Sequence, residues 1–188
     1  SPLVINGLDE KRQFTTMFLN DIDADKREAL DSRLSHIAQT DYIVTGKDAN
    51  SRIKEIASEM NPNCHSLIFI DPYSTEFSWK SMETIININA DIFFLYQTGQ
   101  IARGVAVAKT PDSNIRNFFM DYRTALEVFE RETEQNKSSA LFDLYKSDVK
   151  TVRGPKTLME SIRIKGPRPF YYDMLFITRE TRSKTPWF

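Results

Sequence analysis

Residues 67–74 read LIFIDPYS, an apolar run that ends abruptly in Asp71, Pro72 and Tyr73. Consecutive apolar residues in a short segment predict a strand that is buried on both faces, and a proline is typical of the end of such a strand. The carboxylate and the aromatic ring that follow permit two interpretations. Either they meet a ligand at the strand end, or the proline only stops the strand and Tyr73 packs beneath a helix.

Similar apolar segments on either side of this stretch alternate with amphipathic segments. The alternation predicts strands joined by helices, and strands that are apolar on both faces indicate a mostly parallel sheet with helices on both sides. We therefore expect an α/β three-layer sandwich. The expected strands are residues 14–19, 41–45, 67–70 and 91–96, and the expected helices are residues 2–8, 25–38, 50–60 and 78–88.

The remainder of the chain has a different pattern. Residues 114–150 carry apolar side chains at helical spacing among many charges, which predicts a helical segment. Residues 157–164 and 170–178 predict two strands, and the link between them is too short for a crossover helix, so we expect an antiparallel hairpin over 157–178. A parallel sheet that ends in such a hairpin is typical of the class I methyltransferase fold, which is Rossmann-like. We expect one domain over residues 1–188.

Composition narrows the class of protein. The chain has 188 residues, of which 40% are hydrophobic and 27% charged, as is usual for a soluble globular protein. No apolar run approaches the roughly 18 residues that span a bilayer, and the start of the chain lacks the pattern of a secretion signal. We therefore expect a cytoplasmic protein with no membrane partner. One cysteine and two histidines provide no cluster of metal ligands, so we expect no metal.

The charges are distributed unevenly along the chain. Residues 1–145 contain 15 Lys and Arg against 22 Asp and Glu, whereas residues 146–188 contain 10 against 4. A basic region of this kind can dock a nucleic acid. The alternative is a tail whose charge merely balances an acidic body.

Polar side chains follow each expected strand. Because ligands of open α/β sheets bind beyond the carboxyl ends of the strands, we expect these residues to share one edge. A carboxylate there can accept both hydroxyl groups of a ribose, and a second one can bind the amino group of adenine, an arrangement that suits S-adenosylmethionine. The alternative is that each aspartate is a helix N-cap or a turn former. The residues are Asn20, Asp21 and Asp23, then Gly46 and Asp48, then Asp71, Pro72 and Tyr73, then Gln97, Thr98, Gly99 and Arg103.

The Asp71-Pro72-Tyr73 loop is similar to a motif of enzymes that methylate exocyclic amines. In that (Asp/Asn)-Pro-Pro-(Tyr/Phe) loop, the acidic or amide side chain and a proline carbonyl accept hydrogen bonds from the amine, while the ring stacks on the base. The present loop has one proline where the motif has two.

The order of short motifs along the chain resembles the three-Cys-motif partner proteins, a family of class I S-adenosylmethionine-dependent methyltransferases. The resemblance covers nearly the whole chain, and its most specific pieces are the Asp-Pro-Tyr and Tyr-Tyr segments. The matching segments are SPLV (residues 1–4), FLNDID (18–23), TGKDAN (45–50), FIDPY (69–73) with Trp79 after it, QIAR (100–103) and PFYYDMLF (169–176).

The resemblance implies roles for individual residues. Asp21 or Asp23 would hold the ribose of the cofactor, and Asp48 and Ala49 would flank its adenine. The catalytic group would be Asp71, Pro72 and Tyr73 facing the methyl group, with Asp71 as the acceptor of the proton. Arg103 would orient an anionic substrate, although a surface salt bridge is an equal alternative.

The family carries a glycine-rich turn after its first strand, upstream of the Ser-Pro-Leu segment. This sequence contains no Gly-x-Gly, and no segment ahead of Phe14 resembles the family's first strand. We therefore expect an N-terminally truncated sequence. Two functions follow: a methyltransferase acting on nucleic acid or on a substrate associated with a three-Cys-motif partner protein, or a binding module of the same fold that has lost catalysis and serves as an accessory subunit.

Overall fold

The computed structural model describes residues 14–38, 40–108, 114–166 and 171–180. The chain divides into two compact units, with the boundary between Glu59 and Met60. The single domain expected over residues 1–188 stays a prediction. The helix expected over residues 2–8 lies outside the described residues.

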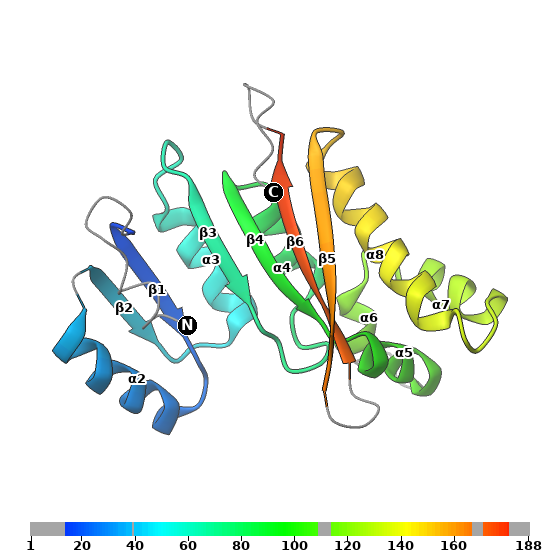
Figure 1. Cartoon of the computed structure of the whole chain (residues 1–188), viewed down its shortest axis with the longest axis horizontal. Helices are drawn as coiled ribbons and strands as arrows, with labels where there is room; N and C mark the ends of the chain where they lie inside the picture. Colours follow the sequence, from blue (N-terminus) through cyan, green and yellow to red (C-terminus); the bar gives the residue numbers. More distant parts are fainter. Residues whose placement is uncertain (1–13, 39, 109–113, 167–170, 181–188) are drawn as a thin grey trace. The chain divides into compact units, whose positions relative to one another are not determined.

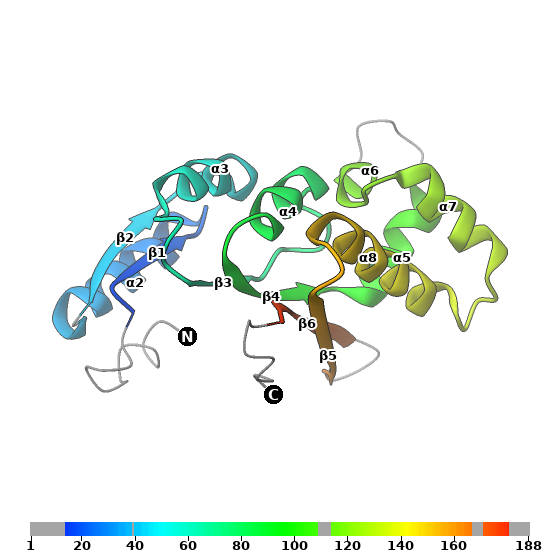
Figure 2. The same ribbon diagram turned by 90° about the horizontal axis from the view of Figure 1, so that it is seen from above.

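The first unit contains a pair of parallel strands and two helices. The register runs from Thr16 opposite Asp41 to Asn20 opposite Thr45, so both strands end at the same edge. The two helices lie on opposite sides of the pair (Figure 2), and Met17 of the first strand and Leu34 of the first helix are buried. The elements are β1 Thr16–Asn20, α2 Ala24–Ile37, β2 Asp41–Thr45 and α3 Ala49–Glu59.

The second unit is built on a four-stranded sheet of order β3-β4-β6-β5 (Figure 1). The strands β3 and β4 are parallel, whereas β6 is antiparallel to both of its neighbours. Its strands are β3 Ser66–Ile70, β4 Ala90–Tyr96, β5 Thr157–Lys165 and β6 Tyr171–Arg179. Its helices are α4 Trp79–Ile86, α5 Thr98–Val107, α6 Asn114–Phe118, α7 Tyr122–Arg131 and α8 Lys137–Arg153.

One face of this sheet forms the core of the second unit. The helices α4, α6, α7 and α8 lie on that side (Figure 2), and alternate residues of β4, Ile92, Phe94 and Tyr96, have no exposed surface. The ring of Tyr145 on α8 stacks on Phe94 with centroids 5.6 Å apart. Burying an apolar side chain of this size stabilises a fold by roughly 1.5–3 kcal/mol, so this aromatic layer fixes α8 onto β4.

None of the described helices of the second unit covers the opposite face of this sheet (Figure 2). Phe93 and Phe176 pack together there with centroids 4.7 Å apart, but Phe69 is 61% exposed and Ile162 is 68% exposed. The expectation of helices on both faces is therefore not met for this sheet by the described residues. The described strands also form two separate sheets where one was expected.

Most of the expected elements are present, and the α/β class is confirmed. The strand over 41–45 is correct to the residue, and the antiparallel hairpin is confirmed with strands one residue longer or shifted by one. β1 begins and ends later than expected, and the helical segment 114–150 is three helices. The helix α5 was not predicted, because Gly99, Gly104 and two valines give its sequence a low helix propensity.

Two further expectations concern membranes and metals. Among residues 14–38, 40–108, 114–166 and 171–180, no helix combines the length and hydropathy that crossing a membrane requires. The same residues hold no group of three or more metal-ligating side chains. Cys64 is exposed and has a free thiol.

Candidate functional site

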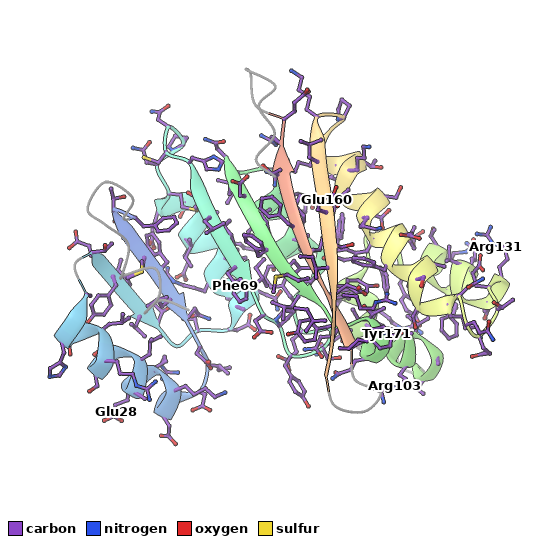
Figure 3. The ribbon with its side chains drawn as sticks, in the orientation of Figure 1. Glu28, Phe69, Arg103, Arg131, Glu160 and Tyr171 are labelled. Atoms are coloured by element: carbon purple, nitrogen blue, oxygen red, sulfur yellow. The ribbon has the colours of Figure 1, made fainter. Side chains whose placement is uncertain are left out.

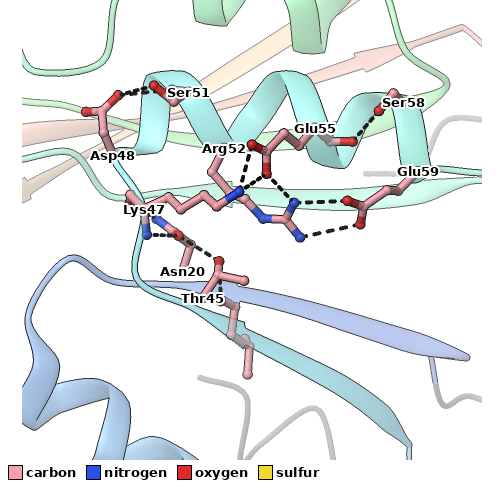
Figure 4. Close-up of polar contacts among 10 residues, drawn as sticks. Asn20, Thr45, Lys47, Asp48, Ser51, Arg52, Glu55, Ser58 and Glu59 are labelled. Atoms are coloured by element: carbon pink, nitrogen blue, oxygen red, sulfur yellow. Dashed lines mark hydrogen bonds and ion pairs between the residues drawn. The ribbon is translucent and has the colours of Figure 1, made fainter.

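The loops that follow β1 and β2 meet at the edge where both strands end. Asn20, the last residue of β1, connects them: its Nδ2 donates to the carbonyl oxygen of Lys47 at 3.0 Å, and its Oδ1 accepts from the Thr45 hydroxyl at 2.8 Å (Figure 4). The backbone N–H of Lys47 donates to the same Oδ1 at 3.3 Å. Asn20 therefore holds the two loops together through both its amide nitrogen and its amide oxygen.

Asp23 is the N-cap of α2. Its Oδ1 accepts from the backbone N–H groups of Asp25 and Lys26, at 3.0 and 3.3 Å. The hydrogen bond from the Lys26 backbone is the largest cause that lowers the pKa of Asp23 below its ordinary value. An N-cap accepts hydrogen bonds from the first N–H groups of a helix. The sequence left open that each aspartate is a helix N-cap, and this role is confirmed for Asp23.

Asp48 has a comparable role at the start of α3. Its Oδ1 accepts from the backbone N–H of Ser51 at 3.0 Å and from the Ser51 hydroxyl at 3.2 Å (Figure 4). Ala49 is the first residue of α3. The second carboxylate oxygen of Asp48 makes no hydrogen bond with any described residue, so Asp48 keeps one free acceptor at this edge.

Asp21, like Asp48, uses one carboxylate oxygen inside the fold and keeps the other free. Its Oδ1 accepts from the backbone N–H of Asp23 at 2.9 Å, and its Oδ2 has no partner among the residues whose positions are described. Ile22, which follows it, is 74% exposed. We did not predict a role for Ile22 from the sequence, although an apolar residue between two loop aspartates is the signal that would have indicated one.

A second edge belongs to the other unit, where β3 and β4 end. Asp71 is exposed and forms no hydrogen bond or ion pair within the described parts of the chain, and Tyr73 is 74% exposed. The interpretation in which Tyr73 packs beneath a helix is therefore wrong. Ser74 has a φ of 59°, a left-handed conformation that non-glycine residues rarely adopt outside tight turns and functional sites.

The loop at this edge is tied to the end of β4. Gln97 Nε2 donates to the Pro72 carbonyl oxygen at 2.9 Å. In the amine-methylating motif a proline carbonyl accepts from the substrate, and here that acceptor already has one donor. A carbonyl oxygen has two lone pairs, so one remains for a second donor.

Arg103 lies on the exposed side of α5. Its Nε donates to the carbonyl oxygen of Gly99 at 3.2 Å, and it makes no ion pair with a described carboxylate. Gly99 in turn faces the ring of Tyr171, since a Cβ on Gly99 would lie 4.0 Å from Tyr171 Cε1. Figure 3 shows Arg103 and Tyr171 in the same area, at the end of the sheet where β6 begins.

A buried carboxylate that was not predicted from the sequence as a functional residue lies near this edge. Asp173 on β6 is 3% exposed, and Arg163 of β5 donates to both of its oxygens, at 2.9 and 3.0 Å. The hydroxyl of Thr98, at the start of α5, also donates to it. The hydrogen bonds to Asp173 raise the pKa of Arg163, and the contacts of Asp173 join β5, β6 and α5.

The basic region 146–188 is partly used within the fold. Lys146 pairs with Asp143 at 2.8 Å, and Arg163 is held by Asp173. Arg153 is 7% exposed and donates to the Ala90 carbonyl oxygen, and burial lowers its pKa to about 10. Arg179 donates to the Ile86 carbonyl oxygen at 3.4 Å. Four of the seven described cations of this region therefore have partners or are buried, which weakens the argument for a continuous basic face.

The structure thus brings Asp21, Asp23 and Asp48 to one edge of the first unit, and Asp71, Pro72 and Tyr73 to one edge of the second. The two edges belong to different units. No family model, curated protein or solved structure matches this chain. The resemblance to the three-Cys-motif partner proteins stays a prediction from the sequence.

Proposed function

We propose that this chain is part of an S-adenosylmethionine-dependent methyltransferase that binds the nucleoside of its cofactor at the edge where β1 and β2 end. The observation that carries the proposal is the free Oδ2 of Asp21, at the carboxyl end of a parallel strand and beside the exposed side chain of Ile22. A carboxylate in this position can accept the hydroxyl groups of a ribose, and an apolar side chain can contact a planar base.

The strand arrangement supports the same proposal. Each unit contains a parallel pair, and β6 lies antiparallel between β4 and β5. A sheet of parallel strands completed by an antiparallel hairpin is the feature that suggested the class I methyltransferase fold. Fold alone does not determine function, so the proposal depends on the chemistry of the residues at the strand ends.

S-adenosylmethionine supplies a methyl group activated by a sulfonium. In the proposal, Asp21 holds the ribose, and Asp48 and Ala49 flank the adenine. For the edge of the second unit, taken by itself, we propose that Asp71 takes up a proton from a methyl acceptor and that the exposed ring of Tyr73 stacks on a planar acceptor. Arg103 orients an anionic substrate, which fits a nucleic acid or a substrate associated with a three-Cys-motif partner protein.

A second candidate function is a binding module that has lost catalysis and serves as an accessory subunit. This candidate is favoured by the hydrogen bonds that several of the candidate residues already make with other parts of the protein. Asp23 caps α2, Asp48 binds Ser51, and the Pro72 carbonyl accepts from Gln97. Residues committed to such contacts support a stable scaffold without requiring a reaction.

Calorimetry with the natural full-length protein separates the two candidates. The methyltransferase predicts saturable binding of S-adenosylmethionine that weakens at least about tenfold in Asp21→Ala, the smallest loss expected for one hydrogen bond to a charged group. Asp25→Ala is the matched control, since Asp25 is an exposed acid of the neighbouring helical turn. No heat at millimolar cofactor would contradict the methyltransferase and favour the accessory role.

A further inference from the structure

Arg27 contacts the loop that carries Asp21. Its Nη1 donates to the backbone carbonyl oxygens of Asp21 and Ile22, at 2.9 and 2.7 Å. The side chain is partly buried, and it forms no ion pair with any carboxylate in the described parts of the chain. One guanidinium nitrogen therefore joins two consecutive peptide units of this loop to the helix α2.

The position of Arg27 in α2 is unfavourable for a cation. It lies in the first part of the helix, four residues after the N-cap Asp23, where the positive end of the helix dipole repels a positive charge. The presence of Arg27 at this position is therefore not explained by the stability of the helix α2. Its two hydrogen bonds to the preceding loop supply one.

Gly46, directly after β2, provides the space that the guanidinium occupies. A Cβ built on Gly46 would lie 2.3 Å from Cζ, 2.5 Å from Nη1 and 2.6 Å from Nε of Arg27. These separations are far inside van der Waals contact, so any side chain at residue 46 must displace the guanidinium. Because only the end of a flexible side chain has to move, the fold would survive while the two hydrogen bonds to the loop are lost.

We propose that Arg27 is a positioning residue for the nucleoside site, and that Gly46 is required because it leaves room for Arg27. The inference rests on the proposed function, because the carboxylate that Arg27 positions is that of Asp21. Fixing these two carbonyl groups fixes the peptide planes on both sides of Ile22, and so restricts the backbone that directly follows the Asp21 side chain. Holding a binding group in its bound geometry raises affinity by removing the cost of ordering it.

A double-mutant cycle tests the proposal. Arg27→Ala, Gly46→Ala and the double variant are compared for affinity by calorimetry with S-adenosylmethionine, and for amide hydrogen exchange over residues 21–23. We expect each single change to weaken binding about tenfold and to speed exchange, as loss of two neutral-acceptor hydrogen bonds implies. The double variant should bind S-adenosylmethionine no more weakly than Arg27→Ala alone. Once the Arg27 guanidinium is gone, a methyl group at residue 46 has nothing to displace.

Two further variants sharpen the cycle. Arg27→Lys keeps a donor near the loop and should recover part of the affinity that Arg27→Ala loses. Arg33→Ala removes an exposed arginine of the same helix that makes no contact with the loop and should leave both readouts unchanged. Additive effects of Arg27→Ala and Gly46→Ala, or unchanged exchange in both, would overturn the inference.

The two readouts separate failure of this inference from failure of the proposed function. If the natural protein binds no S-adenosylmethionine, the proposed function fails. The exchange measurement then decides by itself whether Arg27 and Gly46 together hold the loop.

Discussion

The acidic residues after β1 are close in sequence but have different roles. Asp23 uses its carboxylate to cap α2, and Asp21 uses one oxygen for the Asp23 backbone and leaves the other free. The sequence left Asp21 and Asp23 as equal candidates for the ribose. The hydrogen bonds favour Asp21, because a carboxylate that already caps a helix loses that contact when it turns to a ligand.

This division predicts opposite effects for two neighbouring substitutions. Asp23→Ala should lower the midpoint of thermal unfolding by a few degrees, since the first N–H groups of α2 lose their acceptor. Asp21→Ala should leave that midpoint nearly unchanged and weaken nucleoside binding. Thermal unfolding and calorimetry on the same two samples provide both readouts. A larger loss of binding in Asp23→Ala, at unchanged thermal midpoint, would contradict the assignment.

At the edge of the second unit, the exposed Asp71 and Tyr73 are expected to act on the substrate and to add little to stability. Asp71→Asn and Tyr73→Ala should each lower methyl transfer at least tenfold, on the scale of a lost proton acceptor or a lost stacking contact. Both should unfold at the same denaturant concentration as the natural protein. The control is Glu76→Gln, an exposed acid of the same loop. Unchanged transfer in Asp71→Asn would exclude it as the proton acceptor.

Among the elements, the strand ends are joined by polar contacts between residues far apart in sequence. Asp173 connects β6 to β5 through Arg163 and to α5 through Thr98. Gln97 connects the end of β4 to the loop after β3. Neither contact could be predicted from sequence patterns, because hydrophobic periodicity identifies an element but does not say which polar residues of two elements will meet.

The Asp173 network predicts a large loss of stability when it is broken. Asp173→Ala should lower the free energy of unfolding by about 2–3 kcal/mol, near the lower limit for a buried pair because Arg163 is partly exposed. Urea denaturation measures it. Arg123→Ala is the control, since its pair with Glu127 is exposed on both sides and should contribute almost nothing. Equal effects of the two substitutions would contradict the structural role of Asp173.

Burial of Asp148 on α8 predicts a pH dependence. Asp148 is 8% exposed, and burial, with a smaller contribution from Asp121, raises its pKa from 3.8 to about 6. The folded state then holds a proton more tightly than the unfolded state, so this residue favours the fold at low pH. That contribution is lost as the pH rises from about 4 through 6.

Asp148→Asn should therefore be more stable than the natural protein above pH 6, on the order of 2 kcal/mol, with the difference vanishing below about pH 4. Denaturation curves at several pH values measure this difference. A stability difference that is independent of pH would show that Asp148 is not held in a raised-pKa environment.

For the whole molecule, the sequence predicted the types of element better than their assembly. Apolar runs such as 91–96 and the short hairpin link predicted the strands and the antiparallel pair correctly, because these depend on local pattern. The separation into two sheets and the uncovered face around Phe69 depend on which segments pair and cover one another. The strand ends supplied the candidate residues, whose roles stay predictions, and the hydrogen bonds favour Asp21 over Asp23, a choice that the sequence left open.

The central claim is that the edge at the ends of β1 and β2 binds the nucleoside of the cofactor. A crystal structure of the natural full-length protein with S-adenosylhomocysteine tests it most directly. The proposal predicts ribose hydroxyl groups within hydrogen-bond distance, about 2.7–3.0 Å, of the Asp21 carboxylate, and the base beside Ile22. A nucleoside bound elsewhere, with the Asp21 carboxylate facing solvent, would contradict it.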